Sequence, residues 1–320
     1  MKRAGILILT GVALLTMLSC QRGTTSTGGR PVIALVVKTL NNPFFIDMQK
    51  GAEEAALKAN VILQVQAAER EIDVEKQMQI IENLIQSKVS ALCITPSGSK
   101  EIVPAIVKAN QAGIPVLILD TRVNQQALDQ AGGKIASFVG SDNFEGGKVA
   151  GEFMVKALGG NGKVAVLEGI PGHETGDSRL KGFREAVGAA PGIQIVSSQT
   201  ANWERDQGYN VFQNMLQANP GIQGLFACSD LMALGAVEAI AAAGKTGTIT
   251  VVGFDAFSEA REAVRKGVMA ATVAQFSSEM GRTGVENAVK LLNRESISPE
   301  ITVRIQLITK ENVDASSGSK

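Results

Sequence analysis

The polar residues of this chain that are best suited to bind a ligand occur where short apolar runs end. The members of this set are Asp120, Asp142, Glu168, Ser229, Asp230, Asp255 and Gln275. For any one of them, capping of a following helix is the simpler explanation, because Asp and Ser are preferred at helix N-caps. We expect Asp142, which precedes a helical pattern, to be such a cap. As a set, the residues favour a binding cleft at one edge of a parallel sheet.

Aromatic residues at the same edges add flat apolar surfaces. The stretch VVKTLNNPFFIDMQKG (Val36–Gly51) places Phe44 and Phe45 beside two asparagines, and Trp203 follows SSQTAN. A monosaccharide has apolar C–H faces and a rim of hydroxyls, so aromatic rings combined with charged hydrogen-bonding groups suit it. We therefore predict that one or both phenylalanines stack on a sugar ring. Packing at the helix start remains an alternative for one of the two.

The residues that supply this sugar-binding chemistry lie near predicted strand ends or in the loops beyond them. They are Asn42, Phe44, Phe45, Asp120, Arg122, Arg179, Trp203, Asp255 and Gln275.

Catalytic chemistry finds little support in the sequence. His173 is the only histidine, and its Gly-rich stretch GIPGHETGDSR predicts a solvated side chain rather than a triad member. G-x-S-x-G, H-E-x-x-H and Walker patterns do not occur. The stretch GGKVAG lacks the spacing of a phosphate-binding loop and predicts turns and close helix packing. We expect no enzyme activity, cofactor or metal; an α/β hydrolase or transferase with a carboxylate pair is the competing function.

The elements that must position these residues alternate between strands and helices. Ten short β-branched runs recur, from VIALVV to AATVAQF, and most are separated by amphipathic patterns such as Glu75–Lys88. This alternation predicts parallel sheets covered by helices on both sides. Ten strands exceed one compact sheet, so we predict two α/β lobes. Cys93 and Cys228 lie in apolar runs without metal-ligand spacing, which indicates buried free thiols.

The N-terminal region is a separate unit. Lys2 and Arg3 precede an apolar stretch of signal-peptide length, so residues 1–19 are predicted to be a signal peptide. TMLSC resembles a lipobox, although Leu18 departs from the usual small residue, and it predicts lipidation of Cys20. Residues 20–30 would then form a polar tether. An ordinary signal peptide with a coincidental cysteine is the alternative.

Several motifs in order resemble the bacterial periplasmic ribose-binding protein family, the sugar-binding subunits of ABC importers. They are LVVKTLNNPFF, ANQAGIPVLILD, VGSDNFEGGKVAG, SDLMALGA and VVGFD, and the resemblance runs from about Val32 to Lys310. It implies a type I periplasmic binding protein: two doubly wound parallel-sheet lobes with a ligand cleft between them, joined by three hinge crossings. Lobe one would comprise residues 31–141 and 276–304, and lobe two residues 142–275 and 305–314. Residues 315–320 would be a disordered tail.

The resemblance also carries over individual binding positions, with some departures. Asn42, Phe44, Phe45, Asp120, Arg179, Asp255 and Gln275 match the family pattern. Two family asparagines are replaced by Thr95 and Ser229, and a cleft phenylalanine is replaced by Trp203. The arginine that directly follows the aspartate is replaced by Thr121, with Arg122 one place later. The ligand implied is a monosaccharide that need not be ribose: a pentose, a hexose or a polyol.

The implied function is capture of that sugar and its delivery to an ABC transporter permease. The protein would be a monomer, lipid-anchored in the periplasm or on the outer face of the cell membrane. Presentation of the bound sugar to a chemoreceptor or sensor kinase is the alternative. Nucleic-acid binding is not expected, because the 31 basic residues are balanced by 31 acidic ones. The lac-type repressors that share the fold begin with a helix-turn-helix, where this chain has a signal sequence.

Overall fold

The computed structural model describes residues 29–315. The predicted signal peptide, the lipidation at Cys20 and nearly all of the predicted tether and tail lie outside the described residues. Within residues 29–315, no helix is long and apolar enough to cross a membrane.

Two six-stranded sheets form the framework. The first has the strand order β11-β5-β4-β3-β1-β2 and is parallel throughout. Its strands are β1 (Val32–Thr39), β2 (Ile62–Ala68), β3 (Ala91–Ile94), β4 (Val116–Leu119), β5 (Ser137–Ser141) and β11 (Glu300–Val303). Its helices are α1 (Pro43–Ala59), α2 (Val74–Gln86), α3 (Val103–Gln111), α4 (Gln125–Gln130) and α10 (Ser277–Leu292).

The second sheet has the order β12-β10-β9-β8-β6-β7, in which only β12 runs antiparallel to its neighbour. Its strands are β6 (Asn161–Glu168), β7 (Gly192–Thr200), β8 (Gly224–Ala227), β9 (Thr250–Asp255), β10 (Ala271–Ala274) and β12 (Gln306–Thr309). The helices α5 (Asn143–Ala157), α6 (Glu174–Gly188), α7 (Arg205–Ala218), α8 (Asp230–Ala242) and α9 (Ser258–Arg265) belong with it. The predicted fold of two parallel-sheet α/β lobes is confirmed.

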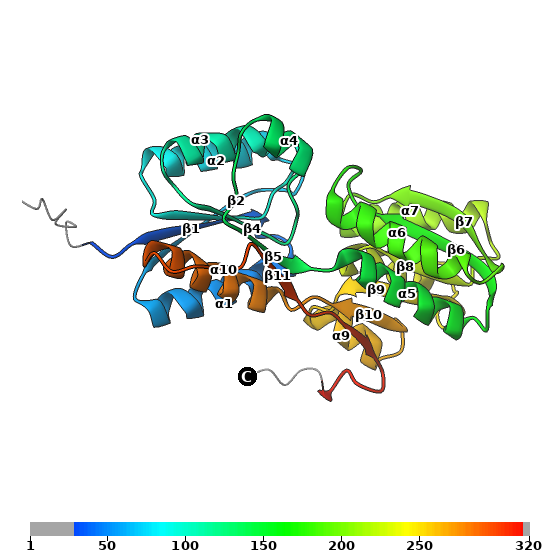
Figure 1. Cartoon of the computed structure of the whole chain (residues 1–320). Coiled ribbons are helices and arrows are strands. Elements are labelled where there is room, and N and C mark those ends of the chain that lie inside the picture. The colour runs from blue at the N-terminus through cyan, green and yellow to red at the C-terminus, as the bar shows by residue number, and fades with distance from the viewer. Residues whose placement is uncertain (1–28, 316–320) are drawn as a thin grey trace, which may run out of the picture. The chain divides into compact units, whose positions relative to one another are not determined.

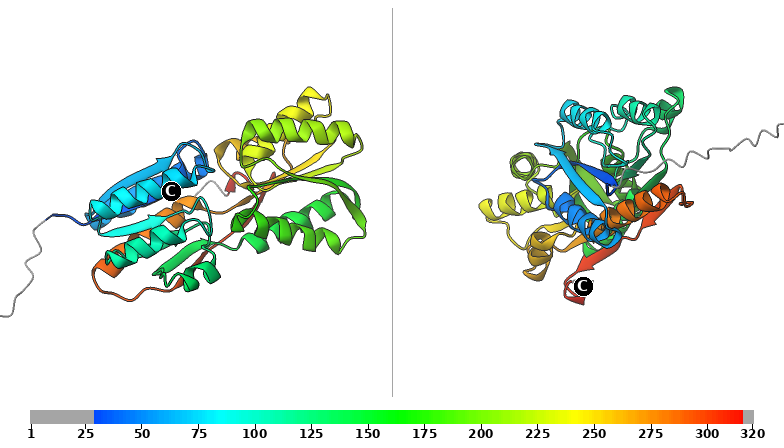
Figure 2. Two further views of the ribbon diagram at one scale, coloured as in Figure 1. Left: turned by 90° about the horizontal axis from the view of Figure 1, so that it is seen from above. Right: turned by 90° about the vertical axis from the view of Figure 1, so that its left-hand side faces the viewer.

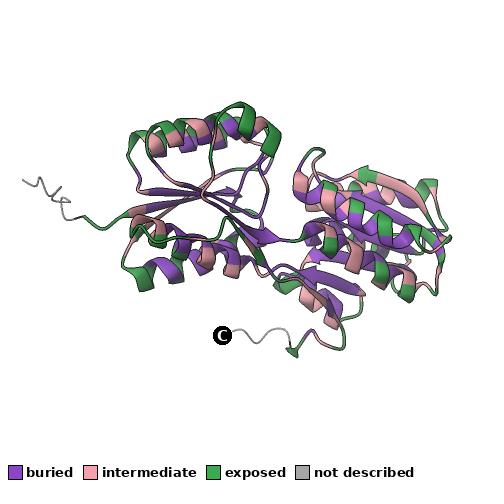
Figure 3. Ribbon diagram, viewed as in Figure 1, coloured by how far each residue is buried: buried purple, intermediate pink, exposed green. Residues whose placement is uncertain are grey.

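Helices cover both faces of each sheet, so each lobe has three layers. In Figure 1, α2, α3 and α4 lie over one face of the first sheet and α1 and α10 over the other. In the second lobe α5 packs against α6, and α7 packs against α8; Figure 2 shows the same layering from two other directions. The inner strands are buried, whereas the edge strands and the outward helix faces are partly or fully exposed (Figure 3).

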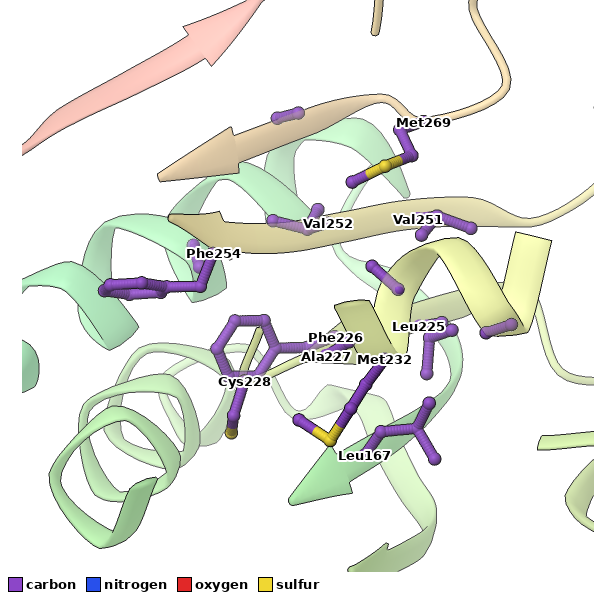
Figure 4. Close-up of a cluster of buried hydrophobic side chains, with 14 of the residues drawn as sticks. Leu167, Leu225, Phe226, Ala227, Cys228, Met232, Val251, Val252, Phe254 and Met269 are labelled. Carbon is purple, nitrogen blue, oxygen red and sulfur yellow. The ribbon is translucent and has the colours of Figure 1, made fainter. Parts of the chain in front are cut away.

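The core of the second lobe is built from the apolar runs recognised in the sequence. Figure 4 shows part of this buried core, with Leu167, Leu225, Val252, Phe254 and Met269 among the side chains on and around the central strands. Phe226 stacks on Phe183 of α6, with ring centroids 4.4 Å apart. Cys93 and Cys228 are buried and free, as predicted.

Two local predictions about helices are confirmed. Asp142 is the N-cap of α5, where its Oδ1 accepts a hydrogen bond from the backbone N–H of Glu145 at 2.9 Å. The glycines of GGKVAG allow α5 and α6 to approach closely, because a Cβ at Gly147 would lie 2.0 Å from the carbonyl oxygen of Arg179. This contact fixes the first turns of α6, from which Arg179 projects.

The chain passes between the sheets three times within the described residues: after β5, after β10 and after β11. Strand β11 was not recognised in the sequence. Its four residues, Glu300–Val303, alternate polar and apolar side chains at the edge of the sheet, and this short pattern does not resemble the buried runs.

Candidate ligand-binding site

A cavity with an empty volume of about 290 Å³ lies at the carboxyl ends of strands from both sheets. Lys38 comes from β1 and Asp255 from the end of β9, while Asp120 and Gln275 directly follow β4 and β10. The full lining is Lys38, Asn42, Phe44, Phe45, Glu71, Asp120, Thr175, Arg179, Trp203, Ser229, Asp255 and Gln275. Both lobes therefore contribute to one site, where open parallel sheets bind their ligands.

Most of the residues predicted for the site lie in this lining. Those present are Asn42, Phe44, Phe45, Asp120, Arg179, Trp203, Ser229, Asp255 and Gln275. Thr95 and Arg122 are not brought to the cavity. Thr95 is fully buried behind it, where its hydroxyl contacts the sulfur of Met48 at 3.6 Å.

Arg122 points away from the cavity. Its guanidinium lies 3.9 Å from the ring centroid of Phe138 and pairs with Glu300 at 2.6 Å, with 41% of the side chain exposed. Thr121 occupies the buried place next to Asp120 and donates a hydrogen bond from its hydroxyl to Asp120 Oδ2 at 2.7 Å. Arg122 therefore adds no positive charge to the cavity lining.

Aromatic rings from both lobes line the cavity. Phe44 and Phe45 meet edge to face, with centroids 5.2 Å apart and planes at 88°, at the start of α1. Asn42 caps this helix by accepting a hydrogen bond from the N–H of Phe44 at 3.0 Å. Both rings also belong to the core below α1, so packing and lining are combined in the same side chains.

Trp203 is the aromatic residue of the second lobe. It is only 5% exposed, and it packs so tightly on the backbone of Gly169 that a Cβ there would lie 1.9 Å from the indole. Its Nε1 donates a long hydrogen bond to His173 Nδ1, at 3.4 Å. His173 is buried beneath the indole, so the expectation of a solvated histidine is wrong. Burial, assisted by the charge of Lys38, lowers the pKa of His173 to about 3.

A buried cation with two carboxylates forms the first-lobe wall. Lys38 Nζ lies 3.7 Å from Glu71 Oε2 and 3.8 Å from Asp120 Oδ2. Glu71 also accepts a hydrogen bond from Asn42 Nδ2 at 2.9 Å. Burial raises the pKa of Glu71, and the charge of Lys38 and the Asn42 hydrogen bond oppose that shift.

Sequence reasoning missed Lys38, Glu71 and Thr175. A lysine that continues the apolar run VIALVV is a detectable signal, because a charge in a buried strand needs partners. Glu71 follows Glu69 in a polar loop, and nothing in the sequence separates the buried carboxylate from the exposed one. Thr175 lies in the first turn of α6, where a hydroxyl is unremarkable.

Arg179 organises the second-lobe wall. Its Nε donates to Asn143 Oδ1 at 2.8 Å and its Nη1 donates to the carbonyl oxygen of Cys228 at 2.7 Å. The same Nη1 lies 3.5 Å from Asp255 Oδ1, which also accepts from Gln275 Nε2 at 2.7 Å. Burial raises the pKa of Asp255 to about 7, against the opposing charge of Arg179.

Asp230 stabilises the backbone turn next to Asp255 through buried hydrogen bonds. It accepts hydrogen bonds from the N–H of Ala256 at 2.6 Å and from the Thr272 hydroxyl at 2.7 Å. Burial, followed by the charge of Asp255, raises the pKa of Asp230 well above its usual value. Asp230 thereby holds the turn at the end of β9 that presents Asp255.

Strained backbone is concentrated at the site. Asp120, Trp203 and Asp255 have φ values of 61°, 67° and 111°. Such conformations are costly for residues other than glycine, and they persist where surrounding structure imposes them. Here they direct three side chains of the lining into one cavity. Among residues 29–315, no cluster of His, Cys, Asp and Glu side chains is arranged to hold a metal ion.

Comparison with known proteins agrees with this geometry. Residues 33–296 match the family model of the periplasmic binding protein domain. The ribose import binding protein of Escherichia coli strain K12 is 38% identical over 282 residues, which cover 88% of this chain and 92% of that protein. The D-allose-binding periplasmic protein of the same strain is 38% identical over 263 residues, 82% of this chain and 85% of that protein.

Solved structures show the same fold. An ABC transporter periplasmic solute binding protein from Actinobacillus succinogenes 130z, with bound D-allose, has a TM-score of 0.86 and 42% identity, covering 89% of this chain and 100% of that one. A solute binding protein from Agrobacterium vitis, bound with α-D-tagatopyranose, has a TM-score of 0.85 and 30% identity, with coverages of 90% and 97%. The resemblance identified in the sequence is thus confirmed, and the chain belongs to the periplasmic binding protein family.

Proposed function

We propose that this chain is an extracytoplasmic solute-binding protein that captures a monosaccharide and delivers it to the permease of an ABC transporter. The observation that carries the proposal is one cavity lined by Phe44, Phe45 and Trp203 together with buried, ionisable hydrogen-bonding groups. Aromatic faces suit the apolar sides of a sugar ring, and charged groups form the stronger hydrogen bonds with its hydroxyls. The relatives named for ribose and D-allose support this ligand class.

The charges of the cavity favour a neutral ligand. Lys38 and Arg179 face Glu71, Asp120 and Asp255, so positive charge is already paired within the site. An added anion would find no unpaired cation and would meet three carboxyl groups. A neutral polyhydroxyl compound can donate to the carboxylates and accept from the lysine and arginine. These charged groups are suited to bind a neutral ligand, and this is in keeping with a transport protein rather than an enzyme.

Family membership supports a location outside the cytoplasm, and the TMLSC stretch supports attachment through a lipid on Cys20. Two acyl chains hold a protein stably at a membrane where a single chain does so only marginally. Mass spectrometry of the N-terminal peptide tests the anchor: a mature N-terminus at Cys20 that carries acyl chains supports it. An unmodified cysteine rules it out.

A thermal-shift screen tests the ligand class. Monosaccharides and polyols are compared with sugar phosphates and amino acids as controls. A ligand that binds only the folded protein stabilises it by about 2.7 kcal/mol at a hundredfold excess over its dissociation constant. We expect stabilisation by one or a few neutral sugars, accompanied by a change in the fluorescence of Trp203, the only tryptophan. Stabilisation by the control compounds alone, or by no sugar, would contradict the proposal.

A further inference from the structure

Glu71 occupies an unusual place in the site. The neighbouring carboxylates Asp120 and Asp255 come from strand ends, whereas Glu71 comes from the loop between β2 and α2. It is 5% exposed, and its hydrogen bond from Asn42 and its 3.7 Å contact with Lys38 leave acceptor positions open. A carboxylate has about four lone-pair positions, and a buried one that lacks partners costs free energy. A hydroxyl donor from the ligand would satisfy it.

Glu71 also lies where the cavity meets a second depression. That depression shares Asn42, Glu71 and Trp203 with the ligand cavity. A substituent that projects from a sugar ring toward this border therefore passes Glu71. The groups on the opposite wall, such as Asp255 and Gln275, belong to the ligand cavity and not to the second depression.

The second depression is acidic. Glu69, Glu204 and Asp206 line it together with Glu71, and the one lining cation, Arg70, is paired with Asp73 at 3.3 Å. Burial is the main cause of the raised pKa of Glu71, and the negative charges of Asp120 and Glu204 add to it. A phosphate or carboxylate substituent would be repelled here, whereas a hydroxymethyl group would be accepted.

We propose that Glu71 accepts a hydrogen bond from the exocyclic hydroxymethyl group of a hexose and thereby selects hexoses over pentoses and over charged sugar derivatives. The inference rests on the proposed function and narrows its ligand class. Sequence similarity alone does not make this distinction, because the relatives named for ribose and for D-allose are equally similar, at 38% identity.

Matched sugar pairs that differ only in the hydroxymethyl group provide the test: D-allose and D-ribose, D-glucose and D-xylose, D-galactose and L-arabinose. Calorimetry measures each affinity for the wild type, Glu71→Gln, Glu71→Ala and the control Glu69→Gln. Glu69 carries the same charge on the same loop, but its side chain is exposed and lies outside the ligand cavity. In the best-bound pair, we expect the wild type and Glu69→Gln to prefer the hexose by about tenfold to a hundredfold. Both Glu71 variants should lose that preference mainly by weaker hexose binding.

The outcomes separate this inference from the proposed function. If a pentose binds best, or if the hexose preference survives in both Glu71 variants, selection by Glu71 is refuted while sugar binding stands. If no sugar of the panel binds the wild type, the proposed function and the inference fail together. Should the variants not fold, the wild type alone decides: the 6-deoxy analogue and the 6-phosphate of the best-bound hexose must each bind at least tenfold more weakly. Equal affinity for either derivative would overturn the proposal.

Discussion

Asp120 and Asp142 both follow strands of the first sheet, yet the structure gives them different environments. Asp120 lines the cavity beside Lys38 and Thr121, whereas Asp142 caps α5. We predict that Asp120→Asn, which keeps the shape and tolerates the φ of 61°, lowers sugar affinity by about tenfold to more than a hundredfold. Asp142→Ala should leave affinity unchanged and reduce the free energy of unfolding by about 1 kcal/mol. Calorimetry measures the sugar affinity of each variant, and urea unfolding measures its stability. If both variants lost affinity to the same extent, the assignment of Asp120 to the site and of Asp142 to a helix cap would be contradicted.

His173 gives the unfolding free energy a pH dependence. Its pKa is lowered from 6.5 to about 3 on folding, so below pH 6.5 the unfolded chain takes up a proton that the folded protein excludes. This contribution to stability is complete above pH 6.5 and decreases as the pH falls toward 3, by up to about 1.4 kcal/mol per pH unit. Asp255, with its pKa raised to about 7, acts in the opposite direction over much of this range.

A comparison of the wild type with His173→Gln isolates the histidine, because the Asp255 contribution is common to both. The glutamine oxygen can still accept from Trp203 Nε1. We expect the wild type to lose stability relative to the variant between pH 6.5 and pH 4.5 in urea unfolding. A difference in unfolding free energy that stays constant across these pH values would show that His173 is not buried in the neutral form.

Sequence reasoning at the residue scale succeeded where a side chain sits at a recognisable strand end. Asp120, Asp255 and Gln275 close apolar runs, and the ends of parallel strands meet at one edge. It failed where tertiary contacts decide the environment. The burial of His173 depends on Trp203, 30 residues away in the chain, and neither has a local pattern that reveals the other.

At the scale of elements, the connection between β6 and α6 determines where Trp203 lies. The indole rests on Gly169, so Gly169→Ala would place a methyl group 1.9 Å from it and push it out of its position. We predict weaker sugar binding and altered tryptophan fluorescence, with the sheet intact by circular dichroism. Gly188→Ala at the end of α6 is the matched control, since a Cβ there meets nothing within 4 Å and should leave both properties unchanged. Normal affinity in Gly169→Ala would show that the indole position is not important for binding.

Element prediction was reliable for long, buried segments and poor for short edge segments. The apolar runs of β1, β3, β4 and β8 are buried along nearly their whole length, so continuous hydrophobicity marks them. β11 is four residues long and lies at a sheet edge, with one residue fully buried. Its pairing with β5 joins residues that are 162 positions apart in the chain, such as Glu300 and Phe138, and no local pattern encodes it.

At the scale of the whole molecule, the cavity must open to admit a ligand, because the lining side chains from both lobes are buried. Asp120 and Phe45 of the first lobe are 4% and 2% exposed, and Arg179 and Trp203 of the second are 4% and 5% exposed. The lining groups of both lobes face one volume of about 290 Å³, so entry of a sugar requires the two walls to separate. The connections after β5, β10 and β11 are the chain segments about which such a motion would occur.

This opening predicts a change in size on binding. A ligand that contacts both walls binds the closed form better than the open one and shifts the population toward it. We expect small-angle scattering to show a smaller radius of gyration at saturation with the sugar identified in the thermal-shift screen. A non-binding sugar, and Asp120→Asn at the same sugar concentration, should leave the profile close to that of the ligand-free protein. If calorimetry shows the wild type saturated while its scattering profile is unchanged, the ligand enters without separation of the walls. The buried carboxylates would then have to exchange their partners within a closed cavity.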